Sequence, residues 1–580
     1  MHNNNSLKKI AIIGAGPAGL FMYKALIASA TSPLEITIFE KQDRPGPGMP
    51  YSAKGAGQEH VTNVSANEIP AIVTPLAEWI QQAAPGLLKK FDIDPHHFNE
   101  YKVLPRLLFG EYLAAQFDLL QNHAGAAGIV TRLLLNCCVQ DATDDPRSNS
   151  VMLTTADGTR YSFDHIIIST GHRWPKELEG QQEGWFDSPY PPAKLAKPLN
   201  WPVAIKGASL TAIDVIRTLS RNNGHFKETQ NGLHYILHES SKDFRMVLHS
   251  LSGLLPATRF HLQDSRLQQG HSFTAAETAA IMEANDGFVP LDLVFDKNFR
   301  EPLKEGQPEL YERIRNMRME EFVDHVMDLR EKLDAFILLK AEYKEAERSI
   351  QRRQSVYWKE LLAVLSYEMN YPAKHFSAED MLRLKRKLMP LITIIIAFVP
   401  QRSCDELIAL HNAGVLSLQG VDAGSGAKPL PGGGCRYHFT DEEGKKIQQD
   451  YRMFIDATGQ PAFMIDDFIF PGLVKDGTVS EAHIKFRDAA AAQAEMANGN
   501  KQVLETAPGE YWMKVPGINI NDHFQVLDRF GTFNPRVHIM AVPYIAGLNP
   551  DYSGLDFCER ASGIIAARLL KNAEAGNEAA

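Results

Sequence analysis

The sequence predicts an α/β protein with two dinucleotide-binding, Rossmann-like domains, the second inserted into the first, and with an additional helical insertion. Three observations carry this prediction. Residues 8–40 combine two apolar strands with an intact Gly-x-Gly-x-x-Gly turn and a helix. Residues 202–214 repeat the strand, the turn and the start of the helix. Apolar strands that end in Thr-Gly, at 163–172 and 451–460, enclose this second unit in the chain.

The composition is that of a globular protein with several domains, because 580 residues exceed what one simple core accommodates. A formal net charge of −10 argues against nucleic-acid binding. Five cysteines, with Cys137 beside Cys138, fit no zinc pattern and no disulfide framework, so we expect no metal and a reducing, cytoplasmic location. The amino terminus lacks the plan of a signal peptide. The longest apolar run, 391–399, is too short for a membrane span and predicts a strand.

Each position of the first glycine-rich turn has a physical role. Gly14 permits the tight turn out of the strand, Gly16 lets a diphosphate approach the backbone, and Gly19 lets the helix pack closely on the sheet. Pro17 suits the first helical turn, where its missing N–H costs nothing. The helix dipole and the free N–H groups there favour an anion. The residues predicted to line the diphosphate are Gly14, Gly16, Pro17, Ala18 and Gly19.

Glu40 ends the second strand of this unit, about 20 residues beyond the glycines. A carboxylate at this place binds both hydroxyls of an adenosine ribose and repels a 2′-phosphate. An ordinary helix after a glycine turn would not explain the placement of this acid. We therefore assign Glu40, with the adjoining Lys41, to a dinucleotide site.

Two further segments follow the first turn, and a plain surface loop is the alternative for the first of them, at 41–52. They contain Gly46, Gly48, Tyr51, Ser52, His60, Asn63 and Ala66. These residues match a Gly-x-Gly-x-x-Tyr-Ser loop and a His-x-x-Asn-x-x-Ala segment, and the combination resembles the bacterial FAD-NAD(P)-binding family of flavoproteins. The resemblance implies FAD in the first site and places residues 60–67 near the isoalloxazine ring. It makes His60 and Asn63 our candidates for catalysis.

The two Thr-Gly strand ends resemble the crossings between the FAD and nicotinamide domains in flavoproteins of the glutathione-reductase type. This likeness puts four further residues beside the cofactor, namely Thr170, Gly171, Thr458 and Gly459. Two unrelated buried strands are the alternative.

Between these segments, residues 74–121 are predicted to be mostly helical and residues 130–139 to form a strand. In this fold class the backbone of such a strand usually holds the adenine. We therefore place the adenine edge at Cys138 or Val139.

The second unit resembles the family's second Gly-x-Gly-Leu-Thr pattern, with two departures. Gly207 is kept, Ser209 stands where the second glycine would be, and Ala212 replaces the third. We assign Gly207 and Ser209 to a nicotinamide nucleotide.

Residues 245–256 resemble the family's Ser-Arg-x-Gly-Leu-Leu-Pro segment, but Leu251 or Ser252 stands in place of the arginine. A 2′-phosphate needs a positive charge. A preference for NADPH is therefore doubtful from the sequence, and NADH or no nicotinamide at all stays open.

Residues 260–390 are rich in charge and carry apolar side chains at helical spacing. They predict a helical insertion that caps or extends the nicotinamide half. The predicted domains are the FAD-binding domain at 1–195 and 451–580, the nicotinamide-type domain at 196–259 and 391–450, and the insertion at 260–390.

The carboxyl-terminal segment is expected to close the FAD domain with a strand at 537–542 and a helix that starts at Ser553. Ser553 and Asp556 form a capping pattern there. In related flavoproteins this helix end points at the flavin, where its dipole stabilises the reduced ring. The likeness assigns Gly554 and Leu555 to the cofactor.

These predictions favour an FAD-dependent oxidoreductase, in particular an NAD(P)H-dependent monooxygenase that hydroxylates a small organic substrate. The alternatives are a flavin dehydrogenase or oxidase without a nicotinamide site, and a non-catalytic FAD-binding protein. Flavin carries the chemistry in the first two cases. Neither the substrate nor the oligomeric state can be predicted from the sequence.

Overall fold

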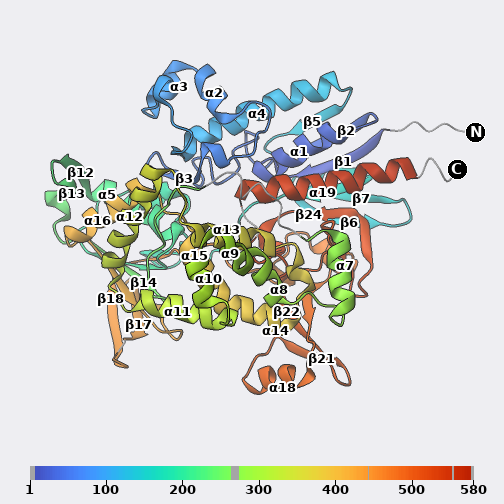
Figure 1. Cartoon of the computed structure of the whole chain (residues 1–580). Helices are drawn as coiled ribbons and strands as arrows, with labels where there is room; N and C mark the ends of the chain where they lie inside the picture. Colours follow the sequence, from blue (N-terminus) through green and yellow to red (C-terminus); the bar gives the residue numbers. More distant parts are fainter. Residues whose placement is uncertain (1–6, 263–272, 442, 552–553, 576–580) are drawn as a thin grey trace, which may run out of the picture.

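The computed structural model describes residues 7–262, 273–441, 443–551 and 554–575 (Figure 1). Within these ranges the protein has two large sheets that are mostly parallel, several small antiparallel sheets and a group of helices in the middle of the chain. The predicted fold class, two Rossmann-like units with a helical insertion, is confirmed.

The first sheet has the strand order β23-β24-β9-β1-β2-β5, and its neighbours are parallel except for β23 and β24. Its strands are β1 (Lys8–Ile13), β2 (Leu34–Phe39), β5 (Val130–Leu134), β9 (His165–Ile168), β23 (Gln525–Leu527) and β24 (Phe533–Ile539). Ile10, Ala11 and Ile12 are fully buried, as expected for a parallel strand covered on both faces. Helix α1 (Pro17–Ser29) joins β1 to β2, so the glycine-rich turn lies at the carboxyl edge of this sheet.

An antiparallel meander covers the sheet beside the end of β2. It consists of β6 (Val139–Asp145), β7 (Ser150–Thr155) and β8 (Arg160–Phe163). The ring of Phe39 meets Tyr161 and Phe163 edge-on, at centroid distances of 5.3 and 5.9 Å. The single strand predicted at 130–139 is therefore wrong in part: β5 ends at Leu134 and β6 begins at Val139, and between them Asn136 turns the chain with a φ of 52°.

The second sheet, β10-β19-β11-β14-β15, is parallel throughout. Its strands are β10 (Trp185–Phe186), β11 (Pro202–Lys206), β14 (Arg245–Ser250), β15 (Leu416–Gly420) and β19 (Met453–Asp456). Helix α5 (Leu210–Asn223) follows β11, and helix α16 (Gln401–Asn412) leads into β15. A second meander precedes β19 and consists of β16 (Gly426–Pro429), β17 (Cys435–Thr440) and β18 (Lys446–Tyr451). The order β19-β11-β14-β15 thus repeats β9-β1-β2-β5 strand for strand.

The predicted boundaries of the second domain need correction. The boundary at 450/451 assigned β19 to the FAD domain, but β19 pairs with β11 in the second sheet. The boundary at 195/196 likewise left out β10, which pairs with β19. The ladders therefore extend the second sheet from Trp185 of β10 to Asp456 of β19.

The apolar run at 391–399 is not a strand. Helix α15 (Met389–Ile396) takes up most of it, and Leu391, Ile392 and Ile395 are fully buried. A helix that is apolar all round is stable when other helices surround it, and a short run without period cannot distinguish such a helix from a buried strand. The second domain therefore resumes near α16 rather than at residue 391.

The helical insertion is confirmed as helical, and its helices pack against both halves of the molecule. The helices are α7 (Ala275–Ala284), α8 (Leu291–Phe295), α9 (Glu301–Gly306), α10 (Pro308–Ile314), α11 (Met319–Glu331), α12 (Ala335–Arg352), α13 (Tyr357–Met369), α14 (Ala378–Arg383) and α15. Leu362 and Leu365 of α13 belong to the hydrophobic cluster of the first sheet. Phe336 of α12 stacks on His411 of α16, with ring centroids 3.7 Å apart. Helix α12 therefore packs against the second sheet's helix α16, and the insertion contacts both halves of the molecule.

The remaining helices and strands lie outside the two large sheets. They are β3 (Val61–Ser65), α2 (Leu76–Gln82), α3 (Pro85–Lys90), β4 (Val103–Pro105), α4 (Arg106–Ala126), β12 (Gly224–Thr229), β13 (Gly232–Leu237), α17 (Pro471–Lys475), β20 (Glu481–Lys485), α18 (Ala489–Ala497), β21 (Val503–Ala507) and β22 (Glu510–Ile518).

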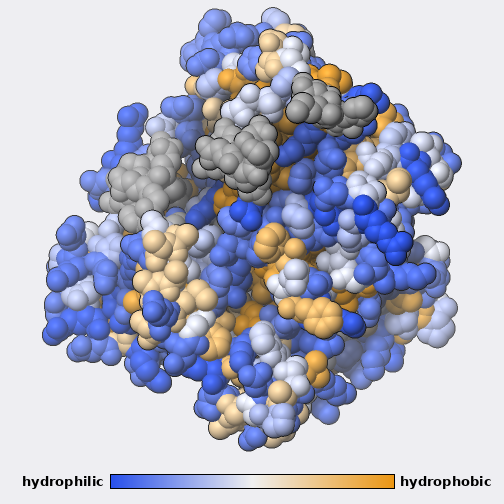
Figure 2. All heavy atoms as spheres, turned by 90° about the vertical axis from the view of Figure 1, so that its right-hand side faces the viewer, coloured by the Kyte–Doolittle hydropathy of each residue, from blue (hydrophilic) through white to orange (hydrophobic). Residues whose placement is uncertain are grey.

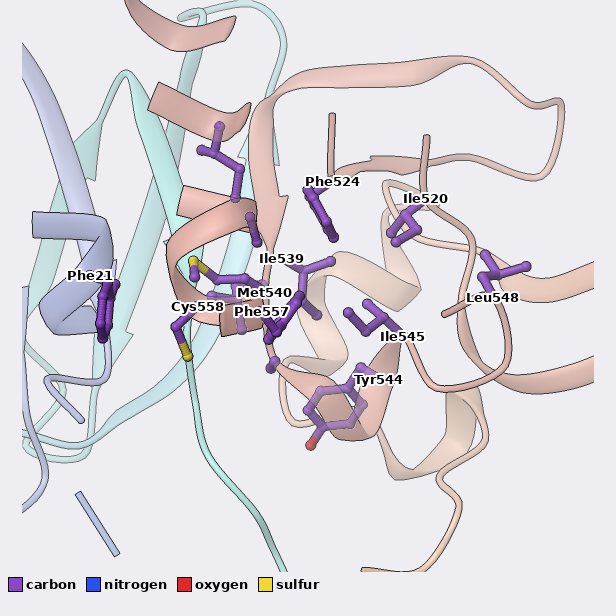
Figure 3. Packing of buried hydrophobic residues seen from close by; sticks show 14 of the residues in the cluster. Phe21, Ile520, Phe524, Ile539, Met540, Tyr544, Ile545, Leu548, Phe557 and Cys558 are labelled. Atoms are coloured by element: carbon purple, nitrogen blue, oxygen red, sulfur yellow. The ribbon is translucent and has the colours of Figure 1, made fainter. Parts of the chain in front are cut away.

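The carboxyl-terminal helix α19 (Gly554–Ala575) closes the first domain against α1 (Figure 1). Figure 3 shows Phe557 and Cys558 of α19 beside Ile539 and Met540, with Phe21 of α1 across the helix. Polar contacts join the two ends of the chain as well: Lys8 Nζ donates to the carbonyl of Leu569, and Lys24 pairs with Glu559 at 2.7 Å. The amino- and carboxyl-terminal segments therefore form one domain.

Hydrophilic residues make up most of the face that carries both chain ends, with apolar side chains gathered near its middle (Figure 2). Among the described helices, none combines the length and the apolar character that a membrane crossing requires.

Candidate cofactor site

The turn after β1 is a cradle that only glycine can form. Gly14 has a φ of +105°, and a Cβ atom there would lie 2.8 Å from the carbonyl oxygen of Ser169, which follows β9. Ser169 Oγ donates to the carbonyls of Ile13 and Gly14 at 3.0 and 2.9 Å. The ends of the two neighbouring strands are thereby fixed against each other.

The helix beyond the turn approaches it closely. A Cβ atom on Gly19 would lie 2.0 Å from the carbonyl oxygen of Gly14, and one on Gly16 would lie 3.2 Å from Gly48 Cα. Pro17 occupies the first turn of α1, followed by Ala18, and no side chain caps this helix start. Free N–H groups at a helix N-terminus bind anions, so the cradle fits a diphosphate.

Glu40 is buried at the edge of this cradle. Its Oε2 accepts the N–H of Ala15 and its Oε1 accepts the N–H of Gln42, both at 2.8 Å. These bonds fix the carboxylate and leave it further lone pairs for a ribose. The adjoining Lys41 is exposed.

The loop at 46–52 packs over the cradle, because Gly46 N–H donates to the carbonyl of Ala15 at 2.7 Å. Tyr51 packs edge-on against Phe109, with ring centroids 4.8 Å apart, and burial raises the pKa of its phenol to about 12. Ser52 Oγ donates to the carbonyl of Met49. Gly48 therefore lies beside the first turn, whereas Tyr51 contacts Phe109 and Ser52 contacts Met49. Their contact with a cofactor stays a prediction.

Thr170, the residue after Ser169, has a hydroxyl group that a polar ligand atom could bind. Thr170 Oγ1 is buried, and no other described residue gives it a hydrogen-bond partner. Buried hydroxyls are normally partnered, so a ligand atom fits here. Gly171 is exposed next to it, and Val139 lies half-buried at the start of β6. The chemistry of this set fits FAD: glycine backbone and a helix start for the diphosphate, a carboxylate for the ribose, and a free hydroxyl.

The second unit repeats the first cradle. Gly207 has a φ of +106°, and a Cβ atom there would lie 2.8 Å from the carbonyl oxygen of Ala457, which follows β19. Ser209 precedes α5 in extended backbone, with a φ of −92°, so its Cβ is tolerated at this position. Thr458 and Gly459 come next at the same edge, where Thr458 Oγ1 donates to Asp456 at 2.5 Å.

Side-chain hydrogen bonds join the segment that follows β9 to the segment that follows β19. Gln460 Oε1 accepts the N–H of Arg173, and its Nε2 donates to the carbonyl of Arg173 at 2.7 Å. Trp174 Nε1 donates to the carbonyl of Gly459 at 3.0 Å. The carboxyl edges of both sheets therefore face a common region.

His60 lies between the two domains rather than on an open surface. It is buried, its Nδ1 accepts the N–H of Gly57 at 2.8 Å, and its Nε2 donates to the carbonyl of Asp214 at 3.1 Å. Because Nδ1 accepts a hydrogen bond, the donating hydrogen lies on Nε2, and these two contacts give the ring a positioning role. Asn63 is exposed on β3, and its carbonyl accepts a hydrogen bond from Arg259 Nη1.

A buried ion pair beside His60 was not predicted. Arg106, at the start of α4, meets Asp214 of α5 at 2.6 Å, and Tyr190 donates to the same carboxylate oxygen at 2.9 Å. The carboxylate of Asp214 is the main attraction that keeps the pKa of Arg106 above its ordinary value despite burial. This contact fixes α5, and with it the second cradle, relative to the first domain.

The carboxyl-terminal helix begins close to the buried carboxyl group of Asp551, which the sequence did not single out. Gly554 opens α19 with a φ of +78°, and Leu555 is buried, whereas Ser553 lies outside the described residues. Just before the helix, the N–H of Asp551 donates to Asn370 Oδ1 at 2.8 Å, and its carboxyl group accepts from Ser366 Oγ. Burial raises the pKa of Asp551 to about 7.

The paired cradles and their crossings define the class of protein, one with two dinucleotide-binding units of the flavoprotein type. A family model described as FAD-NAD(P)-binding matches residues 11–173, which confirms a flavoprotein with FAD as its cofactor. A second model, described as a YdhS-like middle domain, matches residues 274–396 and thus covers the helical insertion.

Particular relatives follow from comparison with known proteins. The chain is 28% identical over 478 residues to the Uncharacterized protein YdhS of Escherichia coli (strain K12), covering 80% of this chain and 86% of that protein. Ornithine hydroxylase PvdA from Pseudomonas aeruginosa shows a TM-score of 0.48 and 11% identity over 98% of this chain and 100% of its own. Kutzneria sp. 744 ornithine N-hydroxylase KtzI shows a TM-score of 0.45 and 13% identity over the same shares.

Gly16→Val should fold but lose FAD, because a branched side chain beside Gly48 fills the place of the diphosphate. The measurement is the flavin absorbance of purified protein. Gly125→Ala is the control, since nothing lies within 4 Å of its added Cβ. A Gly16→Val protein that stays as yellow as the control would contradict the assignment.

Asp214→Asn should destabilise the protein by about 3 kcal/mol, because it removes the charge that pairs buried Arg106. Urea denaturation followed by circular dichroism measures the loss. The matched control is Glu111→Gln, which breaks the exposed pair with Arg44 and should cost about 1 kcal/mol or less. Equal losses in the two variants would show that the interface does not depend on this pair.

Asp551 should make stability depend on pH. Its pKa in the folded protein is about 7, whereas an unfolded aspartate titrates near 4, about its ordinary value. As pH rises between these values the unfolded chain loses a proton that the folded chain keeps, so the free energy of unfolding falls. Asp551→Asn should abolish this fall. At pH 7 the variant should melt at a higher temperature than the wild type, and near pH 4 the two proteins should melt at about the same temperature. Exposed Asp328→Asn is the control, and parallel melting curves for Asp551→Asn and the wild type across this range would refute the effect.

Proposed function

We propose that the protein is an NAD(P)H-dependent flavin monooxygenase that hydroxylates a small organic substrate. The observation that carries the proposal is the second cradle, which repeats the Gly14 geometry at Gly207 and lies next to the first through the Gln460 contacts. A second nucleotide site beside a flavin serves hydride delivery. The balanced reaction consumes NAD(P)H, one proton and O₂: NAD(P)H gives up two electrons as it becomes NAD(P)⁺, one oxygen atom enters a C–H or N–H bond of the substrate, and the other leaves as water.

The residues of the chain would then divide the work. The cradle from Gly14 to Gly19 would hold the FAD diphosphate, Glu40 its ribose, and Gly207 with Ser209 the nicotinamide nucleotide. The start of α19 at Gly554 would place its positive end toward the flavin, where negative charge develops on reduction. His60 would hold the segment that reaches Asn63, which is open to a small molecule.

All five cysteines are free thiols, which supports a reducing, cytoplasmic setting. We also propose the domain division that the sheets support: the first domain from both chain ends, the second domain from Trp185 to Asp456, and the helical insertion within the second.

Anaerobic stopped-flow spectroscopy of the FAD-loaded protein tests the proposal. NADPH or NADH should remove the oxidised-flavin absorbance rapidly without any substrate. Readmitted oxygen should restore the absorbance, and a panel of amines and aromatic compounds should yield a hydroxylated product. No reduction by either nucleotide would contradict the proposal, and reduction by a panel compound alone would favour a dehydrogenase or oxidase.

A further inference from the structure

A groove with a volume of about 690 Å³ opens between the first domain and the helical insertion. One of its walls consists of α2 and the segment that leads into β4, and the other consists of the segment that follows β14 and the end of α12. Among the described residues that line the groove, none belongs to either glycine cradle. The groove is therefore a site distinct from the two nucleotide positions.

Aromatic rings line both walls of this groove. Phe98 and Tyr101 belong to the first-domain wall, and His261 belongs to the opposite wall. The ring centroids of Tyr101 and His261 lie 5.8 Å apart, so the two walls meet at these rings. Tyr101 nevertheless stays 49% exposed. A large ring that remains exposed in a concave surface is typical of a place where a small molecule binds.

Hydrogen bonds fix both walls in the absence of a ligand. The N–H of His261 donates to Ser349 Oγ of α12 at 3.1 Å, and this hydroxyl donates in turn to the carbonyl of Gln354 at 2.5 Å. On the opposite wall the N–H of Tyr101 donates to Asn99 Oδ1 at 3.0 Å. A preformed site loses little conformational entropy when a ligand binds. The groove can therefore hold even a small ligand.

The charges that line the groove favour a cation. Glu78 and Glu100 supply two carboxylates on the first-domain wall, and Arg353 supplies one guanidinium on the opposite wall. All three side chains are exposed, and no described residue forms an ion pair with any of them. Because the carboxylates outnumber the guanidinium, a positive charge is attracted to the groove. The aromatic rings beside the carboxylates attract a cation as well.

The walls of the groove also hold the segment that was predicted to lie near the flavin. The carbonyl of Glu100 accepts the N–H of Asn67 at 3.1 Å. Arg259, two residues before His261, is buried and donates to the carbonyl of Asn63 at 2.7 Å. A ligand in the groove therefore contacts the same two chain segments that support this part of the first domain.

We infer that this groove binds a small organic amine in its ammonium form, with a flat apolar body. The carboxylates of Glu78 and Glu100 would accept hydrogen bonds from the ammonium group. The rings of Phe98 and Tyr101 would pack against the apolar body. The site is separate from the proposed function, because the groove needs neither flavin nor nicotinamide to bind its ligand.

Ligand-observed NMR titration of the FAD-loaded protein tests this inference with two probes of the same shape. Phenethylamine carries the ammonium group, and 2-phenylethanol replaces it with a neutral hydroxyl. Phenethylamine should bind with a Kd on the order of 0.1 mM. The neutral probe should bind about tenfold more weakly, because it lacks the charge that the carboxylates attract. High salt should weaken phenethylamine alone.

Substitutions on the first-domain wall locate the binding. Glu78→Gln and Glu100→Gln keep the size of the side chain and should each weaken phenethylamine about fivefold, with no effect on the neutral probe. Tyr101→Ala should weaken both probes. Asp328→Asn is the matched control, because Asp328 is exposed and does not line the groove, and it should change neither Kd.

Three results would overturn the inference. They are equal binding of the two probes, an unchanged Kd for phenethylamine in both glutamine variants, and no binding of phenethylamine far above the expected Kd. None of these results bears on the reduction of the flavin by NADPH or NADH, so the proposed function would stand or fall separately.

Discussion

The structure depends on a backbone contact in which a glycine turn presses against the end of the neighbouring parallel strand. Gly14 and Gly207 have φ values of +105° and +106°, and each leaves 2.8 Å between a notional Cβ and a carbonyl oxygen of the adjacent strand end. Any side chain would push the strands apart or close the turn. The same contact that holds the sheet edge together therefore also exposes the N–H groups that meet a diphosphate.

The two units share this contact but differ in what surrounds it. In the first unit Glu40 and the loop at 46–52 enclose the turn, and α19 returns from the carboxyl terminus to pack against α1. In the second unit Ser250 takes the position of Glu40, because Gly207 N–H donates to the carbonyl of His249 as Gly14 N–H does to that of Phe39. The buried pair of Arg106 and Asp214 joins the units into one arrangement, so the helix that would hold the second nucleotide keeps a fixed relation to the flavin domain.

The sequence predicts the parts whose chemistry is local. Gly14, Gly16, Gly19 and Glu40 follow from spacing alone, because the turn, the helix start and the strand end are adjacent in the chain. Helix α15 was missed because a short apolar run has no period that separates a buried helix from a strand. The partners of His60 were missed for another reason: Asp214 lies 154 residues away, and no spacing rule brings them together. Ser250 was recognisable in sequence as part of a resemblance, but its equivalence to Glu40 needs the strand register.

The central claim is that the amino-terminal cradle, completed by the end of the chain, holds FAD. The most direct test is to heat the purified protein so that its cofactor dissociates, and then to identify and quantify that cofactor by chromatography. The account predicts one FAD for each chain. Purified protein that contains no flavin and does not take up added FAD, or that binds FMN instead, would contradict it.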